Sequence, residues 1–236
     1  MFLVPIILRD AERTNLFGLN RVAASSLMAA LLTALVGAHL VTSISVMPHV
    51  RELRNFRLMG KAALEFINIA PDQDCLAAAV YQRERFGLLR DQANSADRQG
   101  ILNPRLIQSA RVHQIEGPMP VGPSGVLERA ERQGDQVAVT GWAFLPDRQE
   151  PADAVLLCGD TGDGEPVIFA VTCAKWQRKD LVDTMGSAEF LASGWRCQFP
   201  TSILPLKTVR INAWAFDAEK NRAFRLQGEC NVQPGP

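Results

Sequence analysis

The sequence contains one long stretch without charge, residues 22–50, which has no Asp, Glu, Lys or Arg. A helix needs about 20 mostly apolar residues to cross a bilayer core, and residues 22–47 are enough to cross with some tilt. A cleavable signal peptide is the alternative, but its apolar core is usually shorter and closer to the start of the chain. We therefore predict a transmembrane helix at 22–47, after an N-terminal segment of apolar and polar residues at 1–21.

Small side chains repeat along one face of the predicted transmembrane helix. They occur at every fourth position, at Ser26, Ala30, Ala34, Ala38 and Thr42. Membrane helices associate where small side chains let two backbones approach closely. The series predicts a packing partner, either a second copy of the chain or another helix, although an Ala-rich span can also contain such a series by chance.

After the span, apolar residues recur with a helical period and charged residues lie between them. Leu53, Phe56, Ala63 and Ile67 share one face of a predicted amphipathic helix. The basic side of this helix either contacts lipid phosphates or faces solvent. A proline at position 71 interrupts the pattern, and helical spacing then resumes as far as Gly100. Residues 50–100 are therefore predicted to form juxtamembrane helices.

The periodicity changes after a segment rich in Pro and Gly at residues 101–124, which is typical of a linker. From there, short segments with a period of two are separated by turn residues, as in DQVAVTGWAFLP, EPVIFAVTC and TVRINAWAF. This spacing predicts an antiparallel β-sandwich at residues 125–232. The fold class expected for the whole chain is α+β: a transmembrane helix, a short helical region and then a β-sandwich.

Two of the predicted strands resemble each other, residues 139–144 (VTGWAF) and 211–216 (INAWAF). In each, Trp and Phe share one face while small residues share the other, which predicts two strands in matching environments. An exposed Trp can stack on the apolar face of a sugar ring, so Trp142 and Trp214 are candidate ligand-binding residues. The alternative, favoured by the apolar character of both strands, is that the two rings belong to the core.

No segment carries a recognisable catalytic or cofactor-binding motif. The chain lacks a serine nucleophile elbow, a Gly-rich phosphate loop, an HExxH pair and a combination of His and Cys at zinc-ligand spacing. We therefore nominate no catalytic residue, no cofactor and no metal site. Residues 124–236 contain 15 acidic and 12 basic side chains, which argues against a nucleic-acid partner.

Four of the five cysteines lie in the predicted β-sandwich, and none belongs to a C-x-x-C pair. Disulfides form where a domain faces an oxidising compartment. Scattered buried thiols are the alternative. The cysteines therefore leave the compartment open at this point.

Residues 60–109 (GKAALEFINIAPDQDCLAAAVYQRERFGLLRDQANSADRQGILNPRLIQS), followed by the GWAF-type β region, carry a family resemblance. Over about residues 20–230, the chain resembles the C-terminal part of large polytopic bacterial membrane proteins of the cyanobacterial type, many of them uncharacterised. Their many-span architecture is similar to that of lipid-sugar-dependent glycosyltransferases. The resemblance implies that catalytic carboxylates belong to an early loop between the first spans, and this chain has no such loop.

Two functions follow from these observations. The first is a non-catalytic, membrane-anchored module whose β-sandwich interacts with a partner or a glycan. The second is the C-terminal fragment of a glycosyltransferase-like enzyme whose catalytic part is absent here. Both place the chain in a bacterial plasma (inner) membrane.

The side of the membrane that carries the β-sandwich is predicted differently by charge and by resemblance. Three arginines precede the span and four basic residues follow it within residues 51–61. The positive-inside rule would therefore place the β-sandwich in the cytoplasm by a margin of one charge. The resemblance implies an extracytoplasmic domain, and we follow the resemblance.

Overall fold

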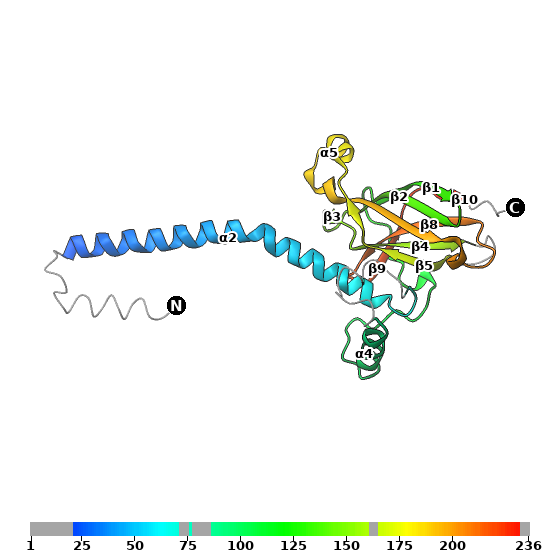
Figure 1. The fold of residues 1–236 in the computed structure, drawn as a ribbon. Helices are drawn as coiled ribbons and strands as arrows, with labels where there is room; N and C mark the ends of the chain where they lie inside the picture. The colour runs from blue at the N-terminus through cyan, green and yellow to red at the C-terminus, as the bar shows by residue number, and fades with distance from the viewer. Residues whose placement is uncertain (1–20, 71–75, 77–85, 161–164, 232–236) are drawn as a thin grey trace. The chain divides into compact units, whose positions relative to one another are not determined.

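The computed structural model describes residues 21–70, 76, 86–160 and 165–231 (Figure 1). The chain divides into two compact units, Met1–Leu53 and Arg54–Pro236. Nearly all of the predicted N-terminal segment at 1–21 lies outside the described residues.

The first long element is α2 (Arg21–Glu65), a helix of 45 residues that continues through Pro48. Among the described residues it is the one helix that is long and apolar enough to cross a membrane. Large apolar side chains in its charge-free part are exposed, including Leu27, Leu31 and Leu35. The five residues of the predicted small-residue face all lie on this helix, where the Thr42 hydroxyl donates to the Ala38 carbonyl oxygen at 2.8 Å.

The second unit contains the predicted β domain, and the expected α+β fold class is confirmed. Every strand pair is antiparallel. The β2 sheet has the order β1-β2-β7-β6, with β3 paired to β2; its strands are β1 (Gly125–Gln133), β2 (Gln136–Leu145), β3 (Glu150–Pro151), β6 (Lys175–Trp176) and β7 (Gly194–Pro200). The β8 sheet has the order β10-β8-β4-β5, with β9 paired to β8; its strands are β4 (Ala154–Asp160), β5 (Val167–Thr172), β8 (Arg210–Asp217), β9 (Arg222–Arg225) and β10 (Cys230–Asn231).

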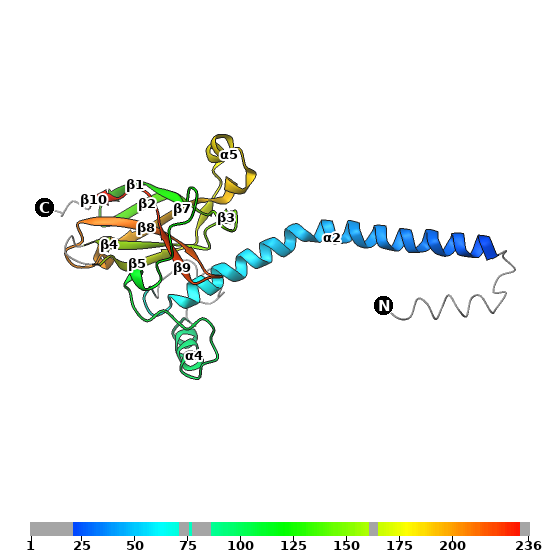
Figure 2. The ribbon, with the colours of Figure 1, turned by 180° about the vertical axis from the view of Figure 1, so that it is seen from behind.

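Short helices connect or cover the strands. They are α4 (Phe86–Arg98), η2 (Val112–Gln114), α5 (Lys179–Met185), η3 (Ala188–Ala192) and η4 (Thr201–Ile203). Figures 1 and 2 show the two sheets stacked face to face, with α5 beside the β2 sheet and the end of α2 beside β9.

The core between the sheets is built from alternating strand positions, with small and branched side chains on β2, β4 and β8 and aromatic rings on β5 and β7. On β8 these are Ile211, Ala213 and Ala215. On β2 the inward position of Gly141 is filled by a neighbouring strand, because a Cβ there would lie 2.8 Å from the ring of Trp195 and 2.1 Å from a backbone oxygen. The close backbone packing predicted for the small residues of the two similar strands is therefore present on both sheets.

The outer face of the β8 sheet is covered by the end of α2. Leu58, Ala62 and Phe66 are buried in the same cluster as Trp214 and Phe216. The rings of Phe66 and Phe216 meet edge to face, with centroids 4.9 Å apart. The helix therefore contributes directly to the core of the β domain.

This packing corrects the helical face expected from the sequence. Ala63 and Ile67 are buried as expected, but Leu53 and Phe56 are 45% and 50% exposed. The buried face is rotated relative to the predicted one, because its i, i+4 series runs through Leu58, Ala62 and Phe66.

The segment at 101–124 is also more than a linker. Leu106, Ile107 and Val112 are buried against the same sheet, and isolated bridges join Arg111 to Val167 and Glu116 to Ala223. The boundary between compact units therefore falls between Leu53 and Arg54, not within 101–124. The strands themselves run from Gly125 to Asn231.

The outer face of the β2 sheet is covered only in part. Trp142 and Phe144 are buried against Leu181 of α5 and Phe190 of η3. Phe144 and Phe190 stack with ring centroids 4.0 Å apart. This second outer cluster is smaller than the one under α2.

Candidate functional site

The two candidate ligand-binding tryptophans are buried in separate clusters. Trp214 is 1% exposed and lies under α2 and η2, where its ring meets that of His113 edge to face. Trp142 is 6% exposed and meets Phe190 edge to face at 6.0 Å. Neither indole presents an open face to a sugar, so the core alternative describes the position of both.

The most unusual polar arrangement of the β domain is an arginine cluster, here defined as Arg54, Arg148, Glu150, Asp153, Asp217 and Glu219. It begins at the turn between β2 and β3, where the amides of Arg148 and Gln149 donate to the carbonyls of Leu145 and Pro146. Gln149 has a φ of 53°, in the left-handed region that non-glycine residues rarely adopt. A residue other than glycine in this backbone conformation costs about 1 kcal/mol or more. Arg148 and Glu150 lie on either side of Gln149 in this turn.

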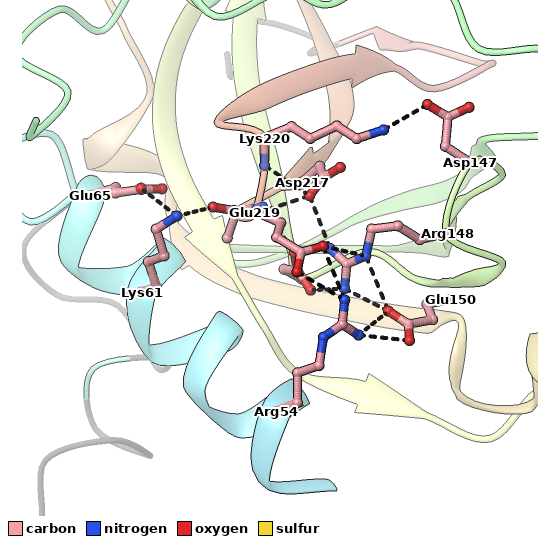
Figure 3. Close-up of polar contacts among 11 residues, drawn as sticks. Arg54, Lys61, Glu65, Asp147, Arg148, Glu150, Asp217, Glu219 and Lys220 are labelled. Atoms are coloured by element: carbon pink, nitrogen blue, oxygen red, sulfur yellow. Dashed lines mark hydrogen bonds and ion pairs between the residues drawn. The ribbon is translucent and has the colours of Figure 1, made fainter. Parts of the chain in front are cut away.

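Arg148 is the centre of the cluster, with a side chain that is only 8% exposed (Figure 3). Its Nη1 donates to Asp153 at 2.7 Å and to Asp217 at 2.9 Å. Its Nη2 donates to Glu150 at 2.6 Å. One guanidinium thus holds three carboxylates from three parts of the β domain.

The two aspartates are almost fully buried, and both are also bonded to backbone amides. Asp153 accepts from the amide of Ala218 at 2.9 Å. Asp217 accepts from the amides of Glu219 and Lys220 at 3.0 and 3.3 Å. These bonds fix the β8–β9 turn, so the cluster joins that turn to the β2–β3 turn.

Arg54 brings α2 into the same cluster. Its Nη1 donates to both carboxylate oxygens of Glu150, at 2.8 and 2.7 Å, and its Nη2 donates to both oxygens of Glu219, at 3.2 and 3.0 Å. Such two-oxygen bonds are among the stronger and more directional contacts of arginine. The helix is therefore held to both turns at once.

About two to three helical turns further along α2, a second pair of charges lies at the β8–β9 turn. The Lys61 ammonium donates to the carbonyl of Ala218 and lies 3.7 Å from the Glu65 carboxylate. Glu65 is 3% exposed, and neither of its carboxylate oxygens has a hydrogen-bond partner among the described residues. A buried carboxylate in this setting is costly to ionise.

The charges of the site shift one another's protonation equilibria. Burial alone would lower the pKa of Arg148, but its hydrogen bonds to Asp153 and Glu150 outweigh burial and hold the pKa above its usual value. Partial burial would raise the pKa of Glu150, whereas bonds from Arg54 and Arg148 bring the pKa below its usual value. Burial raises the pKa of Glu65 to about 7, against the opposing effect of Lys61.

The arginine cluster has a structural role, because its ion pairs hold α2 and two turns together. All four of its carboxylates are engaged by guanidinium groups, so they leave no free base for proton transfer. In the part of the chain that the structure describes, no group of three or more His, Cys, Asp or Glu is arranged to hold a metal ion.

Sequence reasoning did not find the arginine cluster. Arg148 and Asp217 are 69 positions apart and both look like turn residues at the surface. Arg54 belonged to the basic side of the predicted amphipathic helix, whose expected contacts were lipid or solvent. No local pattern in the sequence indicates that these charges meet.

The sequence left two alternatives for the cysteines, disulfides or buried thiols, and the structure contains both. Cys173 is disulfide-bonded, whereas Cys158, Cys197 and Cys230 carry thiols. Burial raises the pKa of the Cys158 thiol well above its usual value, so this thiol is unreactive.

No protein-family model, no curated protein and no solved structure matches this chain.

Proposed function

We propose that the chain is a non-catalytic, membrane-anchored module of a bacterial inner membrane, with the β-sandwich as an extracytoplasmic domain that interacts with a partner or a glycan. The observation that carries this proposal is the double role of α2. One continuous helix contains the apolar stretch and ends inside the core of the β domain. Arg54 adds the polar contacts that fix its second half to both turns.

The disulfide of Cys173 supports the extracytoplasmic side. Disulfides persist in the periplasm and outside cells and are rare in the cytosol, where thiols are kept reduced. Disulfide formation does not depend on the count of basic residues around the span.

Thiol labelling in cells tests the location directly. Cells that express the full chain are denatured in a large maleimide reagent, and the adducts are counted by gel shift. Because three of the five cysteines carry thiols, an oxidising location gives three adducts before reduction and five after it. Cys173→Ser frees its partner and gives four adducts without reduction. Five adducts from the wild type before reduction would contradict an extracytoplasmic domain.

A helix partner in the bilayer is part of the same proposal. The small-residue face of α2 includes Ala34, and Ile at this position would separate two packed backbones with little change in hydrophobicity. We expect Ala34→Ile to weaken self-association of the full chain in a membrane crosslinking assay, whereas Leu35→Ile serves as the matched control. Equal crosslinking of both variants and the wild type would show that this face does not pair with a second copy.

A glycosyltransferase-like polytopic protein remains the second candidate, because the exposed small-residue face of α2 also suits packing against further spans of a longer chain. Reading the coding sequence upstream of Met1 separates the two. Continuous coding with further apolar spans supports the second candidate, and a stop codon followed by a promoter contradicts it.

A further inference from the structure

The outer face of the β2 sheet contains a hollow beside its edge strand. Its volume is about 230 Å³, and it is lined by Arg129, Glu131, Ala138, Thr140, Trp176 and Arg196. The five lining positions on β1, β2 and β7 point away from the core between the sheets, which neighbouring residues on the same strands fill. The hollow is smaller than the roughly 300–1,000 Å³ of drug-sized pockets, so its size suits a single ring.

Trp176 forms the apolar wall of this hollow. It is 38% exposed, whereas the other three tryptophans are 6% exposed or less. Gly194 leaves room for this ring, because a Cβ there would come within 1.8 Å of the indole Cδ1 and 1.9 Å of the indole Nε1. The exposed part of the ring lines the hollow.

The polar wall is a row across three strands. Arg129 and Arg196 are the register partners of Thr140 on its two sides. Arg129 forms an ion pair with Glu131, but no ion pair or side-chain hydrogen bond of the Arg196 guanidinium is present among the described residues. The lining contains two cations and one anion, so it carries a net positive charge.

We infer that this hollow binds one acidic sugar residue, a pyranose that carries a carboxylate. The apolar face of the ring stacks on Trp176, the Thr140 hydroxyl and Glu131 bond ring hydroxyls, and Arg196 receives the carboxylate with two parallel hydrogen bonds. This inference rests on the proposed function, because it names the glycan class that the extracytoplasmic domain would meet.

Calorimetric titration of the full chain tests the inference, in micelles of a detergent without a sugar head group. The probes are methyl glucuronide, methyl glucoside as its neutral counterpart, and tetraglutamate as an acidic peptide. We expect the glucuronide to bind about tenfold more tightly than the glucoside. Trp176→Ala should weaken binding of both sugars about tenfold, and Arg196→Gln should remove the preference for the acidic sugar.

Arg132→Gln is the matched control, because Arg132 is an exposed arginine of the same sheet outside the hollow, and it should change nothing. Protection of Trp176 from acrylamide quenching by the glucuronide gives a second readout. Absence of sugar binding at about 10 mM would overturn the inference, as would tetraglutamate binding that equals glucuronide binding and is unaffected by Trp176→Ala. Neither result alters the adduct count of the thiol-labelling test, so failure of the sugar site and failure of the proposed location are distinguishable.

Discussion

The two sheets carry the same Trp-Ala-Phe sequence on a central strand, yet their outer faces are covered differently. On the β8 sheet, Trp214 and Phe216 are covered by α2 and by the segment around Val112. On the β2 sheet, Trp142 and Phe144 are covered by two short helices, and the hollow beside Trp176 stays open. The covered face packs against the helix, whereas part of the other face stays open.

Truncation of Trp142 and Trp214 to Ala should lower the free energy of unfolding by different amounts. Replacing a buried Trp with Ala costs about 3–5 kcal/mol, depending on how far the surroundings collapse. We expect about 5 kcal/mol for Trp214→Ala, in the large cluster, and about 3 kcal/mol for Trp142→Ala, where α5 and η3 can close over the gap. Urea unfolding of the full chain in micelles measures both. Equal losses, or a larger loss for Trp142→Ala, would contradict the distinction between the faces.

In the arginine cluster, substitution of the buried central arginine should destabilise the fold more than substitution of the exposed one. Arg148→Met leaves Asp153 and Asp217 buried without their cation, and breaking a buried pair in this way costs about 3–5 kcal/mol. Arg54→Gln removes contacts at a side chain that is 38% exposed, so we expect a loss of about 1 kcal/mol or less. The same unfolding experiment compares them, and Arg132→Gln again provides the exposed control. A loss below 1 kcal/mol for Arg148→Met would show that the cluster does not hold the covered face together.

Glu65 should make the covered face sensitive to pH. Its pKa is raised from 4.5 to about 7 in the fold, so the folded state binds a proton more tightly than the unfolded state. Its contribution to stability is therefore greatest below pH 4.5 and declines by about 3 kcal/mol in total as pH rises to about 7. Glu65→Gln should stabilise the protein at pH 8 by up to this amount and have little effect at pH 4.5. A variant that follows the wild type at both pH values would contradict burial of an ionised Glu65.

The sequence predicted the features that depend on local periodicity. The charge-free stretch indicated a helix long enough to cross a membrane, and the segments of period two indicated the antiparallel β domain that the structure confirms. The similarity of residues 139–144 and 211–216 correctly indicated two strands with aromatic and small residues on opposite faces. Each of these signals is contained within one element.

The features that were missed depend on contacts between distant elements. The buried face of α2 was predicted around Leu53 and Phe56, but the side chains that pack on the sheet, Leu58, Ala62 and Phe66, lie on a different face of the helix. The segment at 101–124 looked like a linker because its Pro and Gly residues obscure three apolar side chains that pack on β5 and β8. Charged residues that satisfy one another in the core look the same in sequence as charged residues at the surface.

The central claim is that residues 54–65 of α2 and the β-sandwich form one cooperative unit. Native-state hydrogen exchange of the full chain in micelles measures this directly, because backbone amides of a unit that opens only by global unfolding share one free energy of exchange. We expect the same free energy for the amides of 58–65 and of β8, and the same decrease in both for Arg148→Met. Rapid exchange of the helical amides while β8 stays protected would contradict it.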